Sequence, residues 1–243
     1  MPALSKEDKL RLLTTILESR HADLREQNLN RQGKGHFHVS GMGHEALAAV
    51  SIQMEPDDYI VSYYRDRGLV LGRGMTTRQL GLEYFAKRNL HIWSVPTPTG
   101  SQLLPACGIA WGIQLDGKKN LVVTTIGDAA TRQGDFFEAL CFAKEKKLPV
   151  LFLVEDNGYG ISMPTRNNNP LALNVLEADN WRRIEGQDVQ QVYEATAEAF
   201  ENIRAGGGPF FFWIRMERLS SHTSSDDQKL YRSAQELQTL EES

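Results

Sequence analysis

Two short polar stretches in the middle of the chain contain the residues best suited to chemistry. Asp128 directly follows the apolar run "NLVVTTIG", and Asn157 directly follows the apolar run "LPVLFLVED". The stretch "GDAATRQGD" lacks the glycine-lysine-serine ending of a nucleotide-hydrolysing loop and the three-glycine fingerprint of a dinucleotide site. One carboxylate and one amide oxygen are too sparse a set for calcium. They suit a magnesium ion that keeps water ligands and takes its remaining oxygens from a bound phosphate.

These two side chains meet only if the two apolar runs are neighbouring strands. The runs show no polar alternation, and the amphipathic helix pattern "GDFFEALCFAKEKK" separates them. Strand, helix and strand of these lengths predict a right-handed parallel crossover in a sheet covered on both faces. Ligands of such sheets bind beyond the carboxyl ends of the strands. The sequence therefore predicts an α/β fold, a mostly parallel sheet flanked by helices on both faces, with a magnesium and phosphate site at that edge.

The rest of the chain supplies further elements of the same layers. A Ser5-to-Asp8 capping pattern and apolar residues at Leu10, Leu13, Leu17 and Leu24 predict an amphipathic opening helix. Helices are also expected in "HEALAAVSIQM", "TTRQLGLEYFAKR", "QLLPACGIAWGIQL" and from Asp188 onward, and strands near "WRRIEG" and in "PFFFWIRM". The stretch "DDYIVSYYRDRG" reads as a short strand or turn. The polar stretch "NRQGKGHFHVSGMG" and the proline-rich "WSVPTPTGS" read as loops.

Bulk properties narrow the class of protein. The chain has 243 residues and a net charge of −4, without a run of lysine or arginine, so we expect one domain over residues 1–243 and no nucleic-acid partner. No apolar segment reaches membrane-spanning length, and the first residues form neither a signal nor a transit peptide. Cys107 and Cys141 lack metal-ligand spacing, which favours reduced thiols. These features predict a cytoplasmic protein without a membrane partner.

Five stretches, in their order along nearly the whole chain, resemble those of one protein family. They are "NRQGKGHFHVSGMGHEA", "YYRDRG", the glycine-aspartate stretch, "EDNGYGIS" and "RLSSHTSSDDQKLYRS". This family is the α subunit of the first component of 2-oxo acid dehydrogenases, which depend on thiamine diphosphate. The resemblance implies a thiamine-diphosphate-binding fold and oxidative decarboxylation of a 2-oxo acid. The acyl group would pass to the lipoyl domain of an acyltransferase. The loop "HTSSDDQKLYRS" is more similar to the branched-chain than to the pyruvate enzyme, so branched-chain 2-oxo acids are the favoured substrates.

The resemblance also assigns roles to individual residues. Mg²⁺ would be bound by Asp128, by the Asn157 side chain and by the backbone carbonyl of Tyr159. Tyr64 and Arg65 would contact the diphosphate, and His222 is similar to the family's active-site loop histidine, beside the diphosphate and the incoming lipoyl group. The remaining cofactor-binding positions that the resemblance implies are Gly127, Ala129 and Ala130 around the metal, and Thr97, Pro98 and Thr99 along the aminopyrimidine ring.

Two positions and the length of one connection depart from the family pattern. Ala129 stands where the motif has a second glycine, so the turn there either avoids positive φ or tolerates it at a cost. Asp156 replaces the first asparagine of a pair, and the connection before "SVPTPTGS" is short. His36, His38 and His44 lack a partner at a recognised metal-ligand spacing, and we expect packing or loop roles for them.

The resemblance implies a second polypeptide. In the family, a glutamate that activates the aminopyrimidine comes from a β subunit or a fused β region, and no spare acidic residue near the expected site of this chain replaces it. Family α subunits continue beyond the point where this chain stops, so we expect a C-terminally truncated α portion. Two alternatives stay open: a different thiamine-diphosphate α subunit, such as a pyruvate or acetoin dehydrogenase, and a non-catalytic thiamine-fold assembly module.

Overall fold

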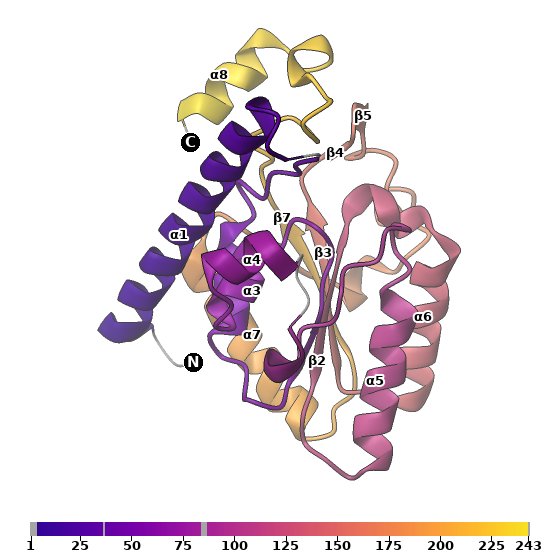
Figure 1. The fold of residues 1–243 in the computed structure, drawn as a ribbon. Helices are drawn as coiled ribbons and strands as arrows, with labels where there is room; N and C mark the ends of the chain where they lie inside the picture. Colours follow the sequence, from indigo (N-terminus) through magenta and orange to yellow (C-terminus); the bar gives the residue numbers. More distant parts are fainter. Residues whose placement is uncertain (1–3, 36, 84–86, 243) are drawn as a thin grey trace.

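The computed structural model describes residues 4–35, 37–83 and 87–242. Its centre is a five-stranded sheet in which every neighbouring pair is parallel (Figure 1). The strands lie in the order β1-β2-β3-β7-β6, which confirms the parallel sheet expected from the sequence. Their bounds are Tyr59–Val61 (β1), Val122–Gly127 (β2), Val150–Asp156 (β3), Arg182–Glu185 (β6) and Phe210–Arg215 (β7).

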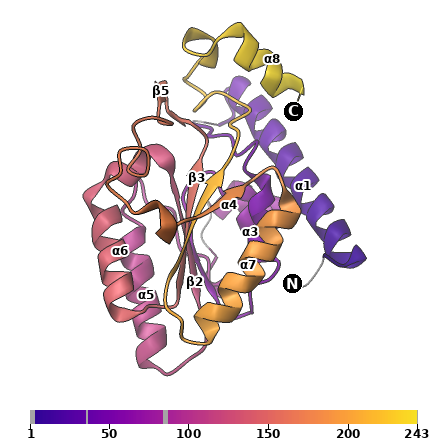
Figure 2. The same ribbon diagram turned by 180° about the vertical axis from the view of Figure 1, so that it is seen from behind.

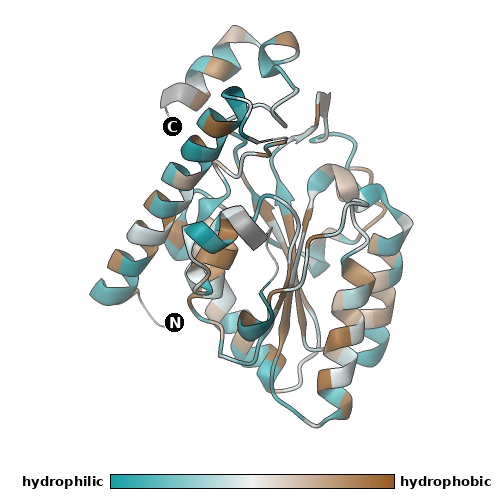
Figure 3. Ribbon diagram, viewed as in Figure 1, coloured by the Kyte–Doolittle hydropathy of each residue, from teal (hydrophilic) through white to brown (hydrophobic). Residues whose placement is uncertain are grey.

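Helices cover both faces of this sheet, as Figures 1 and 2 show. One face packs on α5 and α6, and the opposite face is covered by α2, α3 and α7, with α1 packed against α2 and α3, so two separate hydrophobic cores form. Figure 3 shows the strands between them as apolar along most of their length. The bounds are Lys6–Arg31 (α1), Ala48–Ser51 (α2), Arg67–Gly72 (α3), Leu103–Leu115 (α5), Gly134–Lys146 (α6) and Val189–Arg204 (α7).

The strand order reverses within the sheet. The chain passes from β2 to β3 through α6, and it returns from β6 to β7 through α7 on the other face. Right-handed crossovers that run in opposite directions place their helices on opposite faces, which explains the two layers. Because β1, β2, β3 and β7 are neighbours and all parallel, their carboxyl ends lie side by side at one edge of the sheet.

Smaller elements complete that edge. A single 3₁₀ turn at Asp128–Arg132 joins β2 to α6, and a two-stranded hairpin of β4 (Tyr159–Gly160) and β5 (Met163–Pro164) follows β3. Helix α4 (Thr77–Glu83) lies on the α1 side, and α8 (Ala234–Glu242) ends the described chain. Among the described residues, no helix is both long and apolar enough to cross a membrane.

Helix α1 differs from the sequence expectation in one respect. The capping box between Ser5 and Asp8 is present. The leucines that defined the apolar face are exposed, for example 66% for Leu10. The side chains that α1 buries form a different and mostly polar face, made of Leu12, Thr15, Ser19 and Asp23. Helix α1 therefore packs on the domain largely through polar contacts.

Candidate active site

A cavity of about 300 Å³ lies at the carboxyl ends of β1, β2 and β3. It brings together, from five separate segments of the chain, all but two of the site residues predicted from the sequence. Thr97 and Pro98 do not line it and are exposed on the preceding loop. The selected residues that line it are Tyr64, Arg65, Thr99, Gly127, Asp128, Ala129, Ala130, Asn157, Tyr159 and His222.

The metal corner is formed by Asp128 and Asn157, both buried. Asp128 accepts a hydrogen bond from the Thr165 hydroxyl, and no described lysine or arginine forms an ion pair with it. Burial, together with the nearby Asp156 carboxylate, raises the pKa of Asp128 to about 7, although the Thr165 bond opposes the rise. A buried carboxylate without a cation, beside an amide oxygen, is the oxygen-rich environment that Mg²⁺ prefers.

This corner does not form a complete metal cage. The described residues contain no group of three or more His, Cys, Asp or Glu side chains that could hold a metal ion. A cation here would need oxygens from the backbone, from water or from a bound phosphate. The residues present therefore fit a magnesium ion that arrives with an anionic cofactor.

Ala129 and Asp156, the two positions at this corner that differ from the family motif, have structural explanations. Ala129 lies in the 3₁₀ turn and does not adopt positive φ, so a second glycine is not required for the backbone. A methyl group at Gly160 would lie 2.6 Å from the Ala129 Cβ, and the two positions are thus matched in size. Asp156 accepts hydrogen bonds from the Gly158 amide at 3.0 Å and the Trp213 indole at 2.7 Å. It shapes the turn before Tyr159.

The opposite side of the cavity is cationic. Arg65 is 2% exposed and donates to the Ser40 carbonyl at 2.5 Å and to the His222 carbonyl at 3.0 Å. Its Nη2 also donates to His222 Nδ1 at 2.7 Å. Burial, Arg65 and Arg218 lower the pKa of His222 to about 4, so the imidazole is neutral at pH 7. Because Nδ1 accepts from Arg65, the ring proton is on Nε2, where it can donate to a ligand.

Arg218 was not predicted as a site residue from the sequence, yet it adds a second buried positive charge to this side of the cavity. Its side chain is fully buried behind the cavity wall, where both terminal nitrogens donate to the Ile161 carbonyl at 3.1 Å. Burial lowers its pKa. Neither Arg65 nor Arg218 forms an ion pair with a carboxylate among the described residues. The signal that could have found Arg218 is its place just beyond the apolar strand run "PFFFWIRM", at the ligand-binding edge of the sheet.

A buried polar network supports the metal corner from behind. Burial lowers the pKa of His44, so its ring is neutral. The ring Nδ1 donates to Glu155 at 2.5 Å, and Nε2 lies 3.4 Å from the Asn157 amide nitrogen. This pairing directs the Asn157 oxygen away from His44 and toward the turn, where it accepts from the Tyr159 amide at 3.2 Å. His44 thus has the packing role expected from the sequence, and it also orients a candidate metal ligand. His36 lies outside the described residues.

Comparisons with known proteins agree with this architecture. The family model "Dehydrogenase E1 component" matches residues 13–243. The chain is 33% identical to the 2-oxoisovalerate dehydrogenase subunit alpha of Bacillus subtilis, over 99% of this chain and 80% of the relative. It is 32% identical to the pyruvate dehydrogenase E1 component subunit alpha of Bacillus cereus, over 96% of this chain and 66% of the relative.

A solved structure from Mycobacterium smegmatis, described as a thiamin diphosphate-dependent enzyme, matches the fold with a TM-score of 0.52 and 19% identity. The match covers 71% of this chain and 31% of that chain. Since the family model covers nearly the whole chain, the protein belongs to the dehydrogenase E1 component family, and its relatives are α subunits of 2-oxo acid dehydrogenases.

Proposed function

We propose that this chain is the α portion of a thiamine-diphosphate-dependent 2-oxo acid dehydrogenase that acts with a β subunit or a fused β region. One observation supports the proposal most strongly. At the carboxyl edge of the sheet, the cavity has the Asp128 carboxylate on one side and the Arg65 guanidinium on the other, and neither forms an ion pair with another described residue. A magnesium diphosphate supplies both missing charges.

In this proposal the chain's own residues bind and orient the cofactor. Asp128, the Asn157 side chain and the Tyr159 carbonyl bind Mg²⁺, while Tyr64 and Arg65 contact the diphosphate. His222 presents its Nε2–H at the cavity rim. When bound, thiamine diphosphate supplies the electron sink for decarboxylation. Thr99 and the exposed Thr97 lie on the loop that would follow the cofactor toward its aminopyrimidine end.

A partner chain is the second part of the proposal. Among the described residues that line the cavity, Asp128 is the only carboxylate, so the acid needed at the far end of the cofactor must come from elsewhere. Helix α5 also presents an uncharged outward face, on which Trp111 is 42% and Leu115 is 71% exposed. Helices that are apolar all round are normally buried. A β-type chain packed on α5 would explain that face.

For the substrate, we propose a branched-chain 2-oxo acid, with acyl transfer to a lipoyl domain. Two observations support this substrate. The sequence of the 218–233 loop resembles that of the branched-chain enzyme, and the chain is similar to a 2-oxoisovalerate dehydrogenase subunit. Similar identity to a pyruvate dehydrogenase subunit keeps pyruvate as the second candidate. An acetoin-cleaving α subunit and a non-catalytic assembly module are weaker alternatives.

The test is an assay of the purified chain with thiamine diphosphate, Mg²⁺, an artificial electron acceptor and either 2-oxoisovalerate or pyruvate, with and without a cognate β subunit. We expect turnover only in the mixture, with a higher kcat/KM for 2-oxoisovalerate. Comparable turnover by the chain alone would contradict the need for a β partner. Absence of saturable cofactor binding by the mixture in calorimetry would favour the assembly module.

A further inference from the structure

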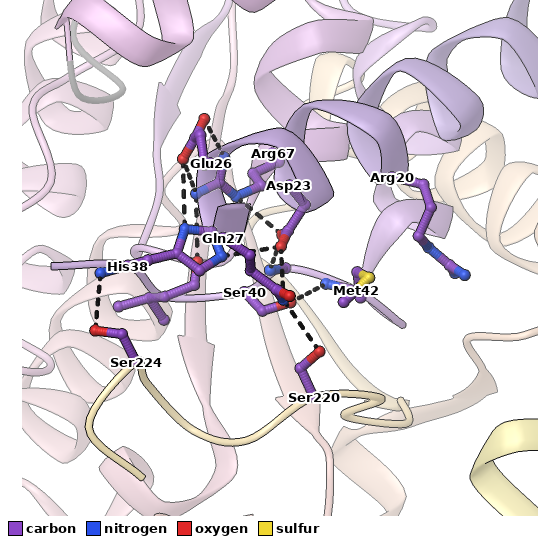
Figure 4. Close-up of polar contacts among 12 residues, drawn as sticks. Arg20, Asp23, Glu26, Gln27, His38, Ser40, Met42, Arg67, Ser220 and Ser224 are labelled. Carbon is purple, nitrogen blue, oxygen red and sulfur yellow. Dashed lines mark hydrogen bonds and ion pairs between the residues drawn. The ribbon is translucent and has the colours of Figure 1, made fainter. Parts of the chain in front are cut away.

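A second buried cluster lies outside the cavity, where the 38–41 segment crosses the C-terminal half of α1 (Figure 4). His38 Nε2 lies 3.0 Å from Asp23 Oδ1, and His38 Nδ1 lies 3.5 Å from Glu26 Oε2. Both ring nitrogens therefore face carboxylates of α1, and only an imidazolium can offer a proton to each. Asp23, which is 1% exposed, also accepts from the Gly41 amide at 2.6 Å.

The charges of this cluster balance when His38 is protonated. Arg67 of α3 donates to both Glu26 oxygens at 2.8 Å, and its Nε lies 3.2 Å from Asp23. Two carboxylates then face two cations. Burial opposes the charge on His38, but the bonds to Asp23 and Glu26 raise its pKa. Three other charged side chains line the cavities beside His38, namely Arg31, Lys34 and Asp226.

The backbone of the 38–41 segment holds the loop that contains His222. The Ser224 amide donates to the His38 carbonyl at 2.9 Å, and the His38 amide donates to the Ser224 hydroxyl at 3.3 Å. Two residues further on, the Ser40 carbonyl accepts from Arg65, whose other contact is His222. The segment thus connects α1 to Arg65 and to the loop that contains His222.

We propose that His38 is a positioning residue, which as an imidazolium fixes the 38–41 segment on α1 and thereby holds the 220–226 loop and His222 at the cavity rim. Loss of the proton turns a ring lone pair toward a carboxylate and leaves the cluster with net negative charge. The segment then loosens, and the Ser224 amide loses its acceptor. This inference concerns the ligand-free chain and is independent of the reaction that the protein catalyses.

Amide hydrogen exchange of the full chain tests the proposal, with protection factors corrected for the intrinsic pH dependence of exchange. The reporter is the 220–226 peptide, which contains the Ser224 amide. For the wild type, we expect protection to fall about tenfold as the pH rises from about 6 to about 9. His38→Gln should show low protection without a pH step. Asp23→Asn removes one carboxylate and should move the step to lower pH.

His21→Gln is the matched control, because His21 is an exposed histidine of the same helix; it should behave as the wild type. Circular dichroism establishes that each variant folds. A flat wild-type profile, or a step that persists in His38→Gln, would overturn the proposal. If His38→Gln does not fold, ¹⁵N shifts of the wild-type His38 ring decide. Two protonated nitrogens at about pH 7 support the proposal, and a neutral tautomer overturns it.

Discussion

Two clusters of buried charge lie on either side of the 38–41 segment, and they differ in how their charges are balanced. On the α1 side, Asp23 and Glu26 face Arg67 and His38, and every charge has a partner within the chain. On the cavity side, and among the described residues, Asp128 forms no ion pair with a cation, and Arg65 and Arg218 form no direct ion pair with a carboxylate.

This difference in charge balance indicates that one cluster stabilises the fold and the other binds a ligand. Burying a charge without a partner is unfavourable, so a fold retains such charges only where something else compensates them. The balanced cluster is complete in the chain alone and fixes one segment to α1. The unbalanced one is complete only with a cation near Asp128 and an anion near Arg65. Substitutions in the two clusters should therefore alter different quantities.

The largest expected effect follows from removing the metal-side carboxylate. Asp128→Ala should abolish Mg²⁺-dependent binding of thiamine diphosphate by the assembled enzyme. We expect a loss of a thousandfold or more, about 4 kcal/mol, because the diphosphate charge then lacks its bridging cation. Titration calorimetry with and without Mg²⁺ measures it. Asp116→Ala, at an exposed position after α5, is the control, and unchanged affinity in Asp128→Ala would reject the metal assignment.

Removing a cation from the balanced cluster should destabilise the fold. Arg67→Met leaves Asp23 and Glu26 buried with too little positive charge, and we expect the free energy of unfolding to fall by about 3–5 kcal/mol. Urea denaturation of the ligand-free chain measures this change. Arg25→Met, at an exposed position of α1, should change it little. A loss below about 1 kcal/mol would mean that the ion pairs are not needed for stability.

Removing a cation from the unbalanced cluster should lower cofactor affinity and leave the stability of the fold nearly unchanged. Arg218→Met deletes a buried charge that forms no direct ion pair with a described carboxylate, so the lost hydrogen bonds are offset by a lost desolvation penalty. We expect unfolding free energy to stay within about 1 kcal/mol of the wild type and cofactor affinity to fall about tenfold. Arg183→Met is the exposed control. Severe destabilisation with normal cofactor affinity would erase the contrast between the clusters.

The smallest effect is the acid dependence of the balanced cluster. Burial opposes the charge on Glu26, but its bonds to His38 and Arg67 lower its pKa to about 2. The associated stability is present above about pH 4 and is lost as the pH falls toward 2. Glu26→Gln should thus be less stable than the wild type by about 1–2 kcal/mol at neutral pH. The gap should close at about pH 2, whereas Glu18→Gln, an exposed control, should show no gap.

Much of the fold was predictable because its signals are local. Unbroken apolar runs predicted β2 and β3, and the pattern between them predicted α6. Their shared carboxyl edge then predicted that Asp128 and Asn157 converge, which the cavity bears out geometrically. The chemical roles of these residues rest on the family resemblance and stay predictions.

The sequence alone was less informative where partners are distant. The leucine periodicity of α1 indicated a helix but not which face would be buried, because the face that packs on the domain meets polar groups such as Glu45 and His38. Arg218 looked like an ordinary loop residue, since its burial depends on β7 inserting beside β3. Thr97 was placed by family analogy on a loop whose course local patterns do not determine.

The position of β7 has a consequence for biosynthesis. Among the described strands, β6 pairs with β7 alone, and β3 presents an unpaired edge until residues 210–215 have left the ribosome. Arg65 and His222 are separated by 157 positions, so the cavity closes only after residue 222 is available. A nascent chain that stalls before β7 carries a finished α6 crossover with an open apolar strand edge, which is the kind of species that chaperones must shield from aggregation.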